Sequence, residues 1–231
     1  MSGEKSGSPL RLAFFYMGYY LAQALYQSYI SVYYTGIGLN AARIGAISAM
    51  VAITSMVIQP IWGTISDRAS SRNKVLKLLC LGATLVVLTF FSTNSFLPLL
   101  LLGCLFAAFY TSIQPLGDSI ILESLHRQGK PFGPIRLTGG LAFASISLLF
   151  GQLLDHFQSN DLIVYGISLT CLITFSASFL LPRSSGRVAG KKSLSFGRLL
   201  TNRTLVLLLL LMAPLMVTMR FFYTFFSPYF L

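Results

Sequence analysis

The chain has 231 residues, of which 55% are hydrophobic and only 10% are charged. This composition excludes an ordinary soluble domain, because a soluble protein of this length needs more charged and polar surface. The net charge of +11 does not indicate nucleic-acid binding, because the basic residues fall in short loops between apolar runs, where they set membrane topology.

The apolar residues are gathered into runs that are long enough to cross a membrane. A helix needs about 20 residues to cross a hydrocarbon core of ~30 Å. A transmembrane β-barrel would instead show alternating segments of about ten residues. The sequence therefore predicts an all-α polytopic membrane protein, with spans at 11–35, 41–66, 74–92, 96–125, 132–155, 161–182 and 203–230.

The charges of the loops predict the orientation of the chain. Lys and Arg are frequent at the N-terminus and after the second, fourth and sixth spans, whereas the other loops carry few basic residues. The positive-inside rule therefore predicts a multi-pass protein of the cell (inner) membrane with a cytoplasmic N-terminus. Three cysteines, Cys80, Cys104 and Cys171, lie inside apolar runs and show no metal-binding spacing, so we expect neither a metal nor a cofactor.

A long polar loop divides the chain into unequal parts. Residues 1–182 are expected to form a six-helix transmembrane bundle, residues 183–202 a cytoplasmic linker, and residues 203–231 a seventh helix that begins a second bundle. We expect the remainder of that bundle, the C-terminal half of the same protein, to be the partner of this chain. The other expected partners are the lipid bilayer and a small-molecule solute, with no nucleic acid.

A short motif recurs in the two halves of the predicted six-helix bundle. The second span ends in "IWGTISDR" and the fifth in "LFGQLLDH", so that Gly63 and Asp67 correspond to Gly151 and Asp155. The predicted topology makes these two spans run in opposite directions. Inverted repeats of three spans are typical of secondary transporters.

The turn after the second span carries charges at regular spacing, in "GTISDRASSRNK". We expect Gly63 to allow close approach of a neighbouring helix and Asp67 to cap or pair at the start of the next helix. Arg68 and Arg72 would lie at the cytoplasmic face. This spacing resembles the signature loop of the major facilitator superfamily, where it would contribute to gating, although Ser70-Ser71 stands where the superfamily usually has Gly-Arg.

Two further stretches narrow the resemblance within the superfamily. Both "QPIWGTISDR" and "FGPIRLTGGLAF" are similar to segments of the lactose permease group of proton symporters. The resemblance implies a major-facilitator-like bundle of two inverted three-helix repeats, followed by the seventh helix. It covers nearly the whole chain, but only the first half of the twelve helices of that group plus the seventh.

Two opposite charges, Asp118 and Arg136, fall inside predicted spans. Asp118 lies about eight residues before the end of the fourth span, ~12 Å along a helix, and Arg136 lies about one turn inside the fifth. An antiparallel hairpin would bring them to similar depth. Because a charge in the membrane is costly unless it is paired or faces a wet cavity, the two side chains either bind a solute or hold each other.

The resemblance assigns roles to these positions. It places Asp118 and Arg136 on the sugar-binding carboxylate and arginine of the lactose permease group, and Phe143 on the aromatic residue that stacks on the sugar. Asp118 is one methylene shorter than the glutamate of that group, which puts lactose itself in doubt. Glu123, Arg127 and Lys130 lie closer to the loop and are expected to be solvated.

Other polar residues inside spans are candidates for the same site. Tyr26 and Gln27 either line a cavity or hydrogen-bond between helices. Gln59 and Gln114 each precede a proline, so they either line the cavity or satisfy a freed carbonyl group. Arg220, in the middle of the seventh span, is expected to bind substrate or to pair with an acid. Tyr33 and Tyr34 are expected in an interfacial aromatic belt.

These features predict a secondary active transporter and not an enzyme. The expected mechanism is proton-coupled symport of a small polar solute (a sugar, nucleoside or organic acid) by alternating access, driven by the proton gradient. One alternative is a drug or metabolite efflux antiporter of the same fold, although the G-P-x-x-G-G motif typical of that group is missing from the fifth span. An alternative of another class is a seven-helix sensor or receptor.

Overall fold

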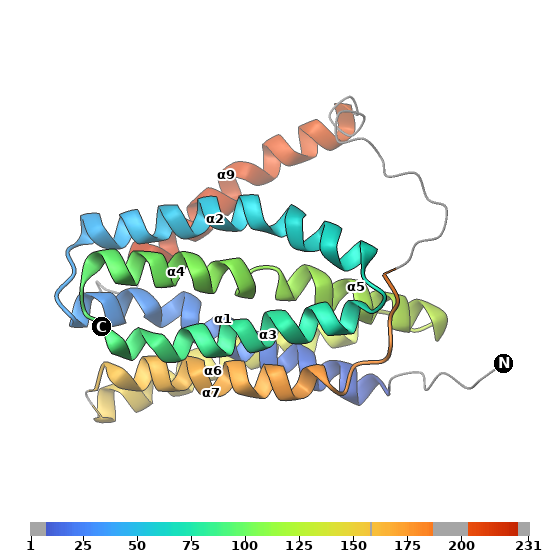
Figure 1. The fold of residues 1–231 in the computed structure, drawn as a ribbon, viewed down its shortest axis with the longest axis horizontal. Helices are drawn as coiled ribbons and strands as arrows, with labels where there is room; N and C mark the ends of the chain where they lie inside the picture. The colour runs from blue at the N-terminus through green and yellow to red at the C-terminus, as the bar shows by residue number, and fades with distance from the viewer. Residues whose placement is uncertain (1–7, 158, 187–202, 226–231) are drawn as a thin grey trace.

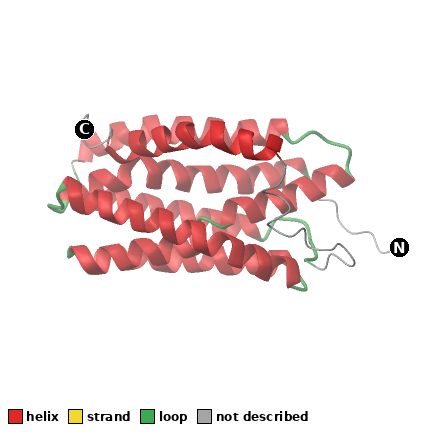
Figure 2. Cartoon of the chain, turned by 90° about the horizontal axis from the view of Figure 1, so that it is seen from above, coloured by secondary structure: helices red, strands yellow, loops and turns green. Residues whose placement is uncertain are grey.

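The computed structural model describes residues 8–157, 159–186 and 203–225. Figure 2 shows helices joined by loops and turns, with no strand in the described part of the chain. Most helices lie side by side along one direction, and α9 is inclined to them (Figure 1). The elements are α1 (Pro9–Gly36), α2 (Ala41–Arg68), α3 (Arg72–Leu88), the short 3-10 helix η1 (Thr89–Ser92), α4 (Phe96–Tyr110), α5 (Ile113–Arg127), α6 (Gly133–Phe157), α7 (Asp161–Ser178) and α9 (Arg203–Phe225).

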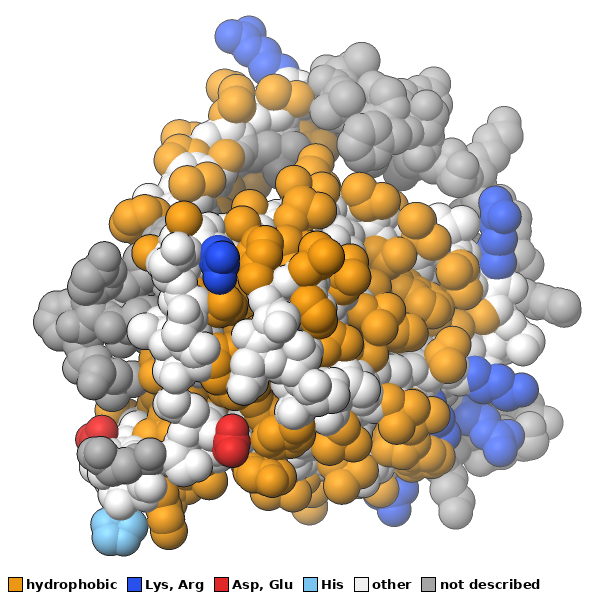
Figure 3. All heavy atoms as spheres, turned by 60° about the vertical axis from the view of Figure 1, so that its left-hand side comes forward, with side chains coloured by type: hydrophobic (Ala, Val, Ile, Leu, Met, Phe, Trp, Pro, Cys, Tyr) orange, Lys and Arg blue, Asp and Glu red, His pale blue; other side chains and the backbone are white. Residues whose placement is uncertain are grey.

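The helices confirm the predicted class of an all-α polytopic membrane protein. Among the described residues, five helical segments are long and apolar enough to cross a membrane: Ala41–Arg68, Arg72–Ser92, Phe96–Arg127, Gly133–Phe157 and Asp161–Ser178. Hydrophobic side chains also cover most of the face shown in Figure 3. The two remaining predicted spans correspond to α1 and α9.

The helix α1 occupies the interior of the bundle. It packs mainly against α6 and α7, while α3 packs against α7 and α4, and α2 packs against α4. Tyr33 and Tyr34, near the end of α1, are only 1% and 2% exposed. The interfacial-belt prediction for these two residues is therefore wrong, because α1 is enclosed by other helices and its tyrosines become core side chains.

The predicted fourth span is broken into two helices that lie end to end (Figure 1). α4 ends at Tyr110 and α5 begins at Ile113. Pro115 explains the break, because it has no N–H to donate to the carbonyl four residues earlier and its ring clashes with that carbonyl. Pro115 therefore lies in the first turn of α5, where no such hydrogen bond is needed, and the carbonyl of Thr111 becomes available to another donor.

The helix ends that the sequence predicts to be cytoplasmic lie together at one end of the bundle. The start of α1, the end of α2, the start of α3 and the end of α5 share one end of the bundle (Figure 1). In Figure 3 most of the visible Lys and Arg side chains gather toward one side of the molecule. Most of the predicted linker, residues 187–202, and the end of the seventh span lie outside the described residues.

Candidate functional site

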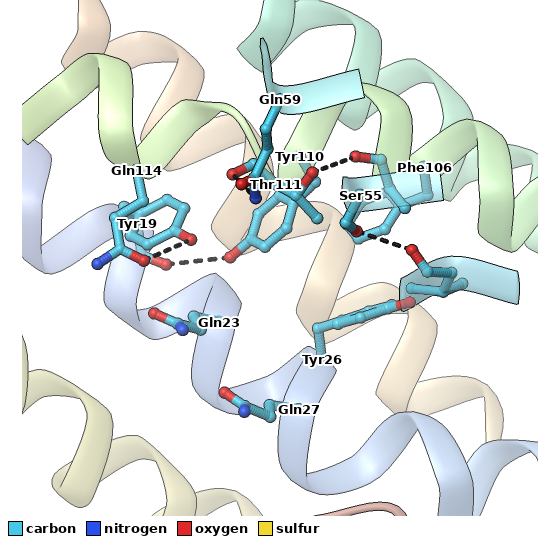
Figure 4. A pocket seen from close by; sticks show the side chains of 12 residues that line it. Tyr19, Gln23, Tyr26, Gln27, Ser55, Gln59, Phe106, Tyr110, Thr111 and Gln114 are labelled. Atoms are coloured by element: carbon cyan, nitrogen blue, oxygen red, sulfur yellow. Dashed lines mark hydrogen bonds between the residues drawn. The ribbon is translucent and has the colours of Figure 1, made fainter. Parts of the chain in front are cut away.

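A polar cavity of about 150 Å³ lies between α1, α2, α4 and α5. Figure 4 shows side chains from these helices arranged around it. The space is large enough for several water molecules. Its lining consists of Tyr19, Gln23, Tyr26, Gln27, Val51, Ser55, Gln59, Phe106, Ala107, Tyr110, Thr111 and Gln114.

The cavity wall combines aromatic rings with neutral hydrogen-bonding groups. The Tyr110 ring stacks on Tyr19 and on Phe106, with centroid distances of 5.4 and 4.8 Å. The Tyr110 hydroxyl donates to the carbonyl of Tyr19 at 3.3 Å. The side-chain oxygen of Gln23 is buried without a hydrogen-bond partner among the described residues. The wall can therefore contact an apolar ring face and also exchange hydrogen bonds, while none of its lining side chains carries a formal charge.

The two glutamines that precede prolines both line this cavity. Gln59 also donates to the Thr111 carbonyl at 3.3 Å, which is the carbonyl that Pro115 leaves without its helical partner. Gln114 lies in the first turn of α5. Gln59 thus has both of the roles considered, because the helix break itself forms part of the cavity wall, whereas Gln114 lines the cavity and bonds Tyr19 and Tyr20.

Among the predicted substrate-binding residues, Tyr26 and Gln27 line the cavity. The Tyr26 ring lies 4.8 Å from that of Phe106, centroid to centroid. Phe143 is partly buried against the hydrophobic core and is not among the lining residues. The side chain of Arg220 lies outside the described residues.

Asp118 and Arg136 lie next to the cavity without lining it. Arg136 is exposed, and its Nη1 donates to the hydroxyl of Tyr16 at 2.7 Å and to the hydroxyl of Tyr20. The Asp118 carboxyl group is a side-chain hydrogen-bond partner of Tyr16 and lies within electrostatic range of Arg136, but its Oδ1 is buried without a hydrogen-bond partner among the described residues. In this part of the chain the two charges therefore meet around tyrosines of α1, with no direct ion pair between them.

A glycine explains how α1 reaches Arg136. A Cβ atom at Gly139, one turn after Arg136 on α6, would lie 2.7 Å from Tyr16 Cδ1 and 2.7 Å from Tyr20 Cδ2. Any larger residue would push the two rings away. The ring of Tyr20 consequently lies close beneath the guanidinium, whose Cζ is 5.3 Å from the ring centroid, within the range of a cation–π contact.

A chain of hydrogen bonds joins these charges to the cavity. Tyr19 donates to the side-chain oxygen of Gln114 at 3.4 Å, and the Gln114 amide donates to the Tyr20 hydroxyl at 3.1 Å. The same hydroxyl accepts from Arg136. Only two hydrogen bonds therefore separate Arg136 from a side chain of the cavity wall.

The charged turn after α2 shows which of the two roles expected of Asp67 is present. Arg72 Nη2 lies 3.1 Å from Asp67 Oδ1, so Asp67 pairs with the next helix and does not cap it. Arg68 is exposed. A Cβ at Gly63 would meet no described atom within 4 Å, so the described part of the chain holds no helix close to Gly63, and the close approach stays a prediction. By contrast, a Cβ at the repeat-related Gly151 would lie 3.0 Å from the Tyr29 hydroxyl.

Glu123 is also more engaged than the sequence predicted. Its carboxylate lies 3.5 Å from Arg72 and 2.6 Å from Arg127, and it accepts from the Ser184 hydroxyl at 2.6 Å. The expectation that Glu123 is simply solvated is therefore wrong, because α5 ends against the α2–α3 turn and the segment that follows α7. Arg127 is 53% exposed, in agreement with its predicted place at the loop.

The segment 182–186, which follows α7, is bound to the same end of the bundle. Asn73 donates to the carbonyl of Pro182 at 2.9 Å and accepts from the backbone of Ser184 at 2.8 Å. The Arg72 N–H donates to the Ser184 carbonyl at 3.0 Å. The predicted linker thus leaves the bundle from a fixed point on the α2–α3 turn.

Sequence reasoning missed most of the cavity wall and the tyrosines that hold Arg136. A pattern that could have revealed them is present in α1, where Tyr19, Gln23 and Gln27 recur every four residues and so share one helical face. Tyr16 and Tyr20 have the same spacing. Polar side chains that line up on one face of a membrane helix indicate a cavity or a polar partner.

The fold and the cavity define a multi-pass helical membrane protein with an internal polar site. Residues 10–231 match the family model described as the MFS_1 like family. The chain therefore belongs to the MFS_1 like family, and the predicted membership of the major facilitator superfamily is confirmed.

Curated relatives match part of the chain. It is 34% identical over 145 residues to a maltose permease of Geobacillus stearothermophilus, covering 63% of this chain and 36% of the relative. It is 30% identical over 174 residues to a probable 3-phenylpropionic acid transporter of Escherichia coli (strain K12), covering 74% and 43%. The chain thus spans less than half the length of these relatives, both of which are named as transport proteins.

A solved structure supports the fold. The nucleoside transporter NupG superposes with a TM-score of 0.73 at 17% identity, over 92% of this chain and 56% of that protein. At this identity the likeness shows a shared fold. It confirms the predicted major-facilitator-like architecture.

Proposed function

We propose that this chain forms the N-terminal bundle of a secondary active transporter that carries a small polar solute by alternating access. The observation that carries the proposal is the uncharged polar cavity between α1, α2, α4 and α5. Unsatisfied polar groups cost several kcal/mol in a membrane, so a membrane bundle that keeps a polar, amide-lined space indicates a solute site. The names of the relatives include a sugar permease and a nucleoside transporter, whose solutes have hydroxyl groups that such a wall can bind.

The cavity has the chemistry of a site for ring-shaped polar solutes. Gln23, Gln27 and Gln114 offer amide donors and acceptors, and Tyr110 and Phe106 offer flat apolar surfaces. Such a wall can bind hydroxyl groups at the edge of a ring and pack against its face. The other side of the site would come from the C-terminal half of the transporter, which rocks against this bundle in alternating access.

Proton coupling is the finer part of the proposal. Asp118 is half-buried in a membrane helix and has one carboxylate oxygen without a hydrogen-bond partner among the described residues. A carboxyl group in such a place can change its protonation when its surroundings change. Arg136, close to it and exposed, would respond to that change. The transporter would then use the proton gradient of a cell membrane, with the N-terminus in the cytoplasm and no other cofactor.

The test is uptake by the full-length transporter in proteoliposomes with an imposed proton gradient. Maltose, uridine and 3-phenylpropionate serve as radiolabelled probes. We expect gradient-dependent uptake of at least one probe, reduced about tenfold or more by Asp118→Asn. No uptake of any probe would contradict solute transport, and uptake that ignores the gradient and Asp118→Asn would contradict proton symport.

A further inference from the structure

The guanidinium of Arg136 is held in place by tyrosine hydroxyls of α1. Arg136 is exposed and does not line the cavity, yet its Nη1 is bound by two hydroxyl groups of α1. The guanidinium has five N–H donors and no acceptor. The two tyrosines therefore fix one edge of the group and leave other donors able to reach a carboxylate.

Tyr20 is the point at which the cavity and the charge meet. Its hydroxyl oxygen accepts both from Gln114 on α5 and from Arg136 on α6. A hydroxyl oxygen has two lone pairs, so these two donors use its whole acceptor capacity. Loss of the hydrogen bond from Gln114 would therefore change the position or strength of the hydrogen bond from Arg136.

Gln114 is placed to sense an occupant of the cavity. It lines the cavity and also bonds both Tyr19 and Tyr20. A solute hydroxyl that binds the Gln114 side chain would compete with one of these tyrosines. Gln114 and Asp118 are four residues apart on α5, so they lie on the same face of that helix.

Asp118 supplies the alternative partner for Arg136. Its Oδ1 is buried with no hydrogen-bond partner among the described residues, and the carboxylate lies within electrostatic range of the guanidinium. A buried, unsatisfied carboxylate oxygen is costly. If Tyr20 released Arg136 while Tyr16 still held Nη1, the remaining guanidinium donors could turn to that oxygen, which would be a second arrangement of the same charge.

We propose that Gln114 and Tyr20 are positioning residues that transmit occupancy of the cavity to Arg136. In the empty cavity, Tyr20 holds Arg136 away from Asp118. When a solute engages Gln114, the hydrogen bond to Tyr20 is lost and Arg136 moves toward Asp118. This inference rests on the proposed function, because it requires a solute in the cavity.

The experiment measures uptake kinetics of the full-length transporter in proteoliposomes, with whichever of maltose, uridine or 3-phenylpropionate the wild type carries. Tyr20→Phe removes only the shared hydroxyl, and Gln114→Met removes the amide at similar volume. We expect Tyr20→Phe to change KM about tenfold, the effect of losing one hydrogen bond to a charged group, and Gln114→Met, which removes hydrogen bonds to neutral hydroxyls, to change it about fivefold or more. The matched control is Tyr29→Phe, which removes a hydroxyl that joins α1 to Ser147 of α6 away from the cavity. Its KM should stay within about twofold of wild type.

A double-variant test separates transmission from simple damage to the fold. If Tyr20 acts through Arg136, Tyr20→Phe should change KM less than about twofold in an Arg136→Lys background. Equal effects of Tyr20→Phe in both backgrounds, or an unchanged KM in both single variants of an active transporter, would overturn the inference alone. A wild type that carries none of the probes would overturn the proposed function, and the inference with it.

Discussion

Gly139 offers a sharp test of the packing that brings α1 to Arg136. In Gly139→Ala, the new Cβ would lie 2.7 Å from ring carbons of Tyr16 and Tyr20, whereas carbon atoms rest at about 3.5–4.0 Å. Each ring would have to move by roughly 1 Å, and both rings are buried, at 2% and 7% exposure. Overpacking of this kind costs about 1–3 kcal/mol.

The neighbouring glycine supplies the matched control. Gly140 is on the same helix, but a Cβ there would meet no described atom within 4 Å. Both substitutions gain about 1 kcal/mol from the better helix propensity of alanine, so this contribution cancels in the comparison. Gly139→Ala should therefore be less stable than Gly140→Ala by about 1–3 kcal/mol.

The assay is thermal or denaturant unfolding of the full-length protein in detergent, followed by uptake in proteoliposomes. Gly140→Ala should unfold at the same midpoint as wild type or higher, and Gly139→Ala at a lower midpoint. Gly139→Ala should also change uptake, because Tyr16 and Tyr20 would no longer hold Arg136 in place. Equal midpoints for the two variants would refute the close packing of α1 on α6.

Three further predictions concern the two ends of the bundle. Ser184→Ala removes the hydrogen bond to Glu123 and should speed trypsin cleavage of the residues after α7, which an unchanged cleavage rate would contradict. Arg72→Ala should lower the free energy of unfolding by about 1–2 kcal/mol, because Arg72 pairs with two carboxylates. The control is Arg68→Ala, at an exposed position, which should change it by no more than about 0.5 kcal/mol. Equal losses would argue against a stabilising role for the two ion pairs of Arg72. The orientation can be tested with single cysteines in a cysteine-free background. Ser70→Cys should react with an impermeant maleimide only after the cells are opened, whereas Thr93→Cys should react in intact cells. The reverse pattern would contradict the proposed orientation.

The fold was largely predictable because its main determinant is local. Runs of apolar residues of membrane-crossing length predicted the spans, with α4 and α5 as one span, and Lys and Arg in alternate loops predicted which helix ends gather together. The break between α4 and α5 was also encoded locally, by Pro115, although only the structure shows where the helix stops. The boundaries differ by a few residues, as at α3, which begins at Arg72 against the predicted 74.

The site was less predictable because it depends on which faces of distant helices meet. Helical rise alone gave Asp118 and Arg136 a similar depth, but it could not reveal that tyrosines from α1, about 120 residues before Arg136 in the sequence, would lie between them. The same limit applies to glycine. Gly63 matched a known motif yet faces no described neighbour, whereas Gly139, part of an ordinary Gly-Gly pair, is where α6 packs tightly against two aromatic rings of α1.

The break at Thr111 gives the cavity a polar group that no substitution of a cavity-lining side chain can remove. Because Pro115 cannot donate to it, the Thr111 carbonyl takes its hydrogen bond from Gln59. Replacing Gln59 would expose a backbone acceptor to the cavity and would not make that wall apolar. The side chains around this point can therefore change while the main chain keeps one acceptor in the wall, for as long as residue 115 is proline.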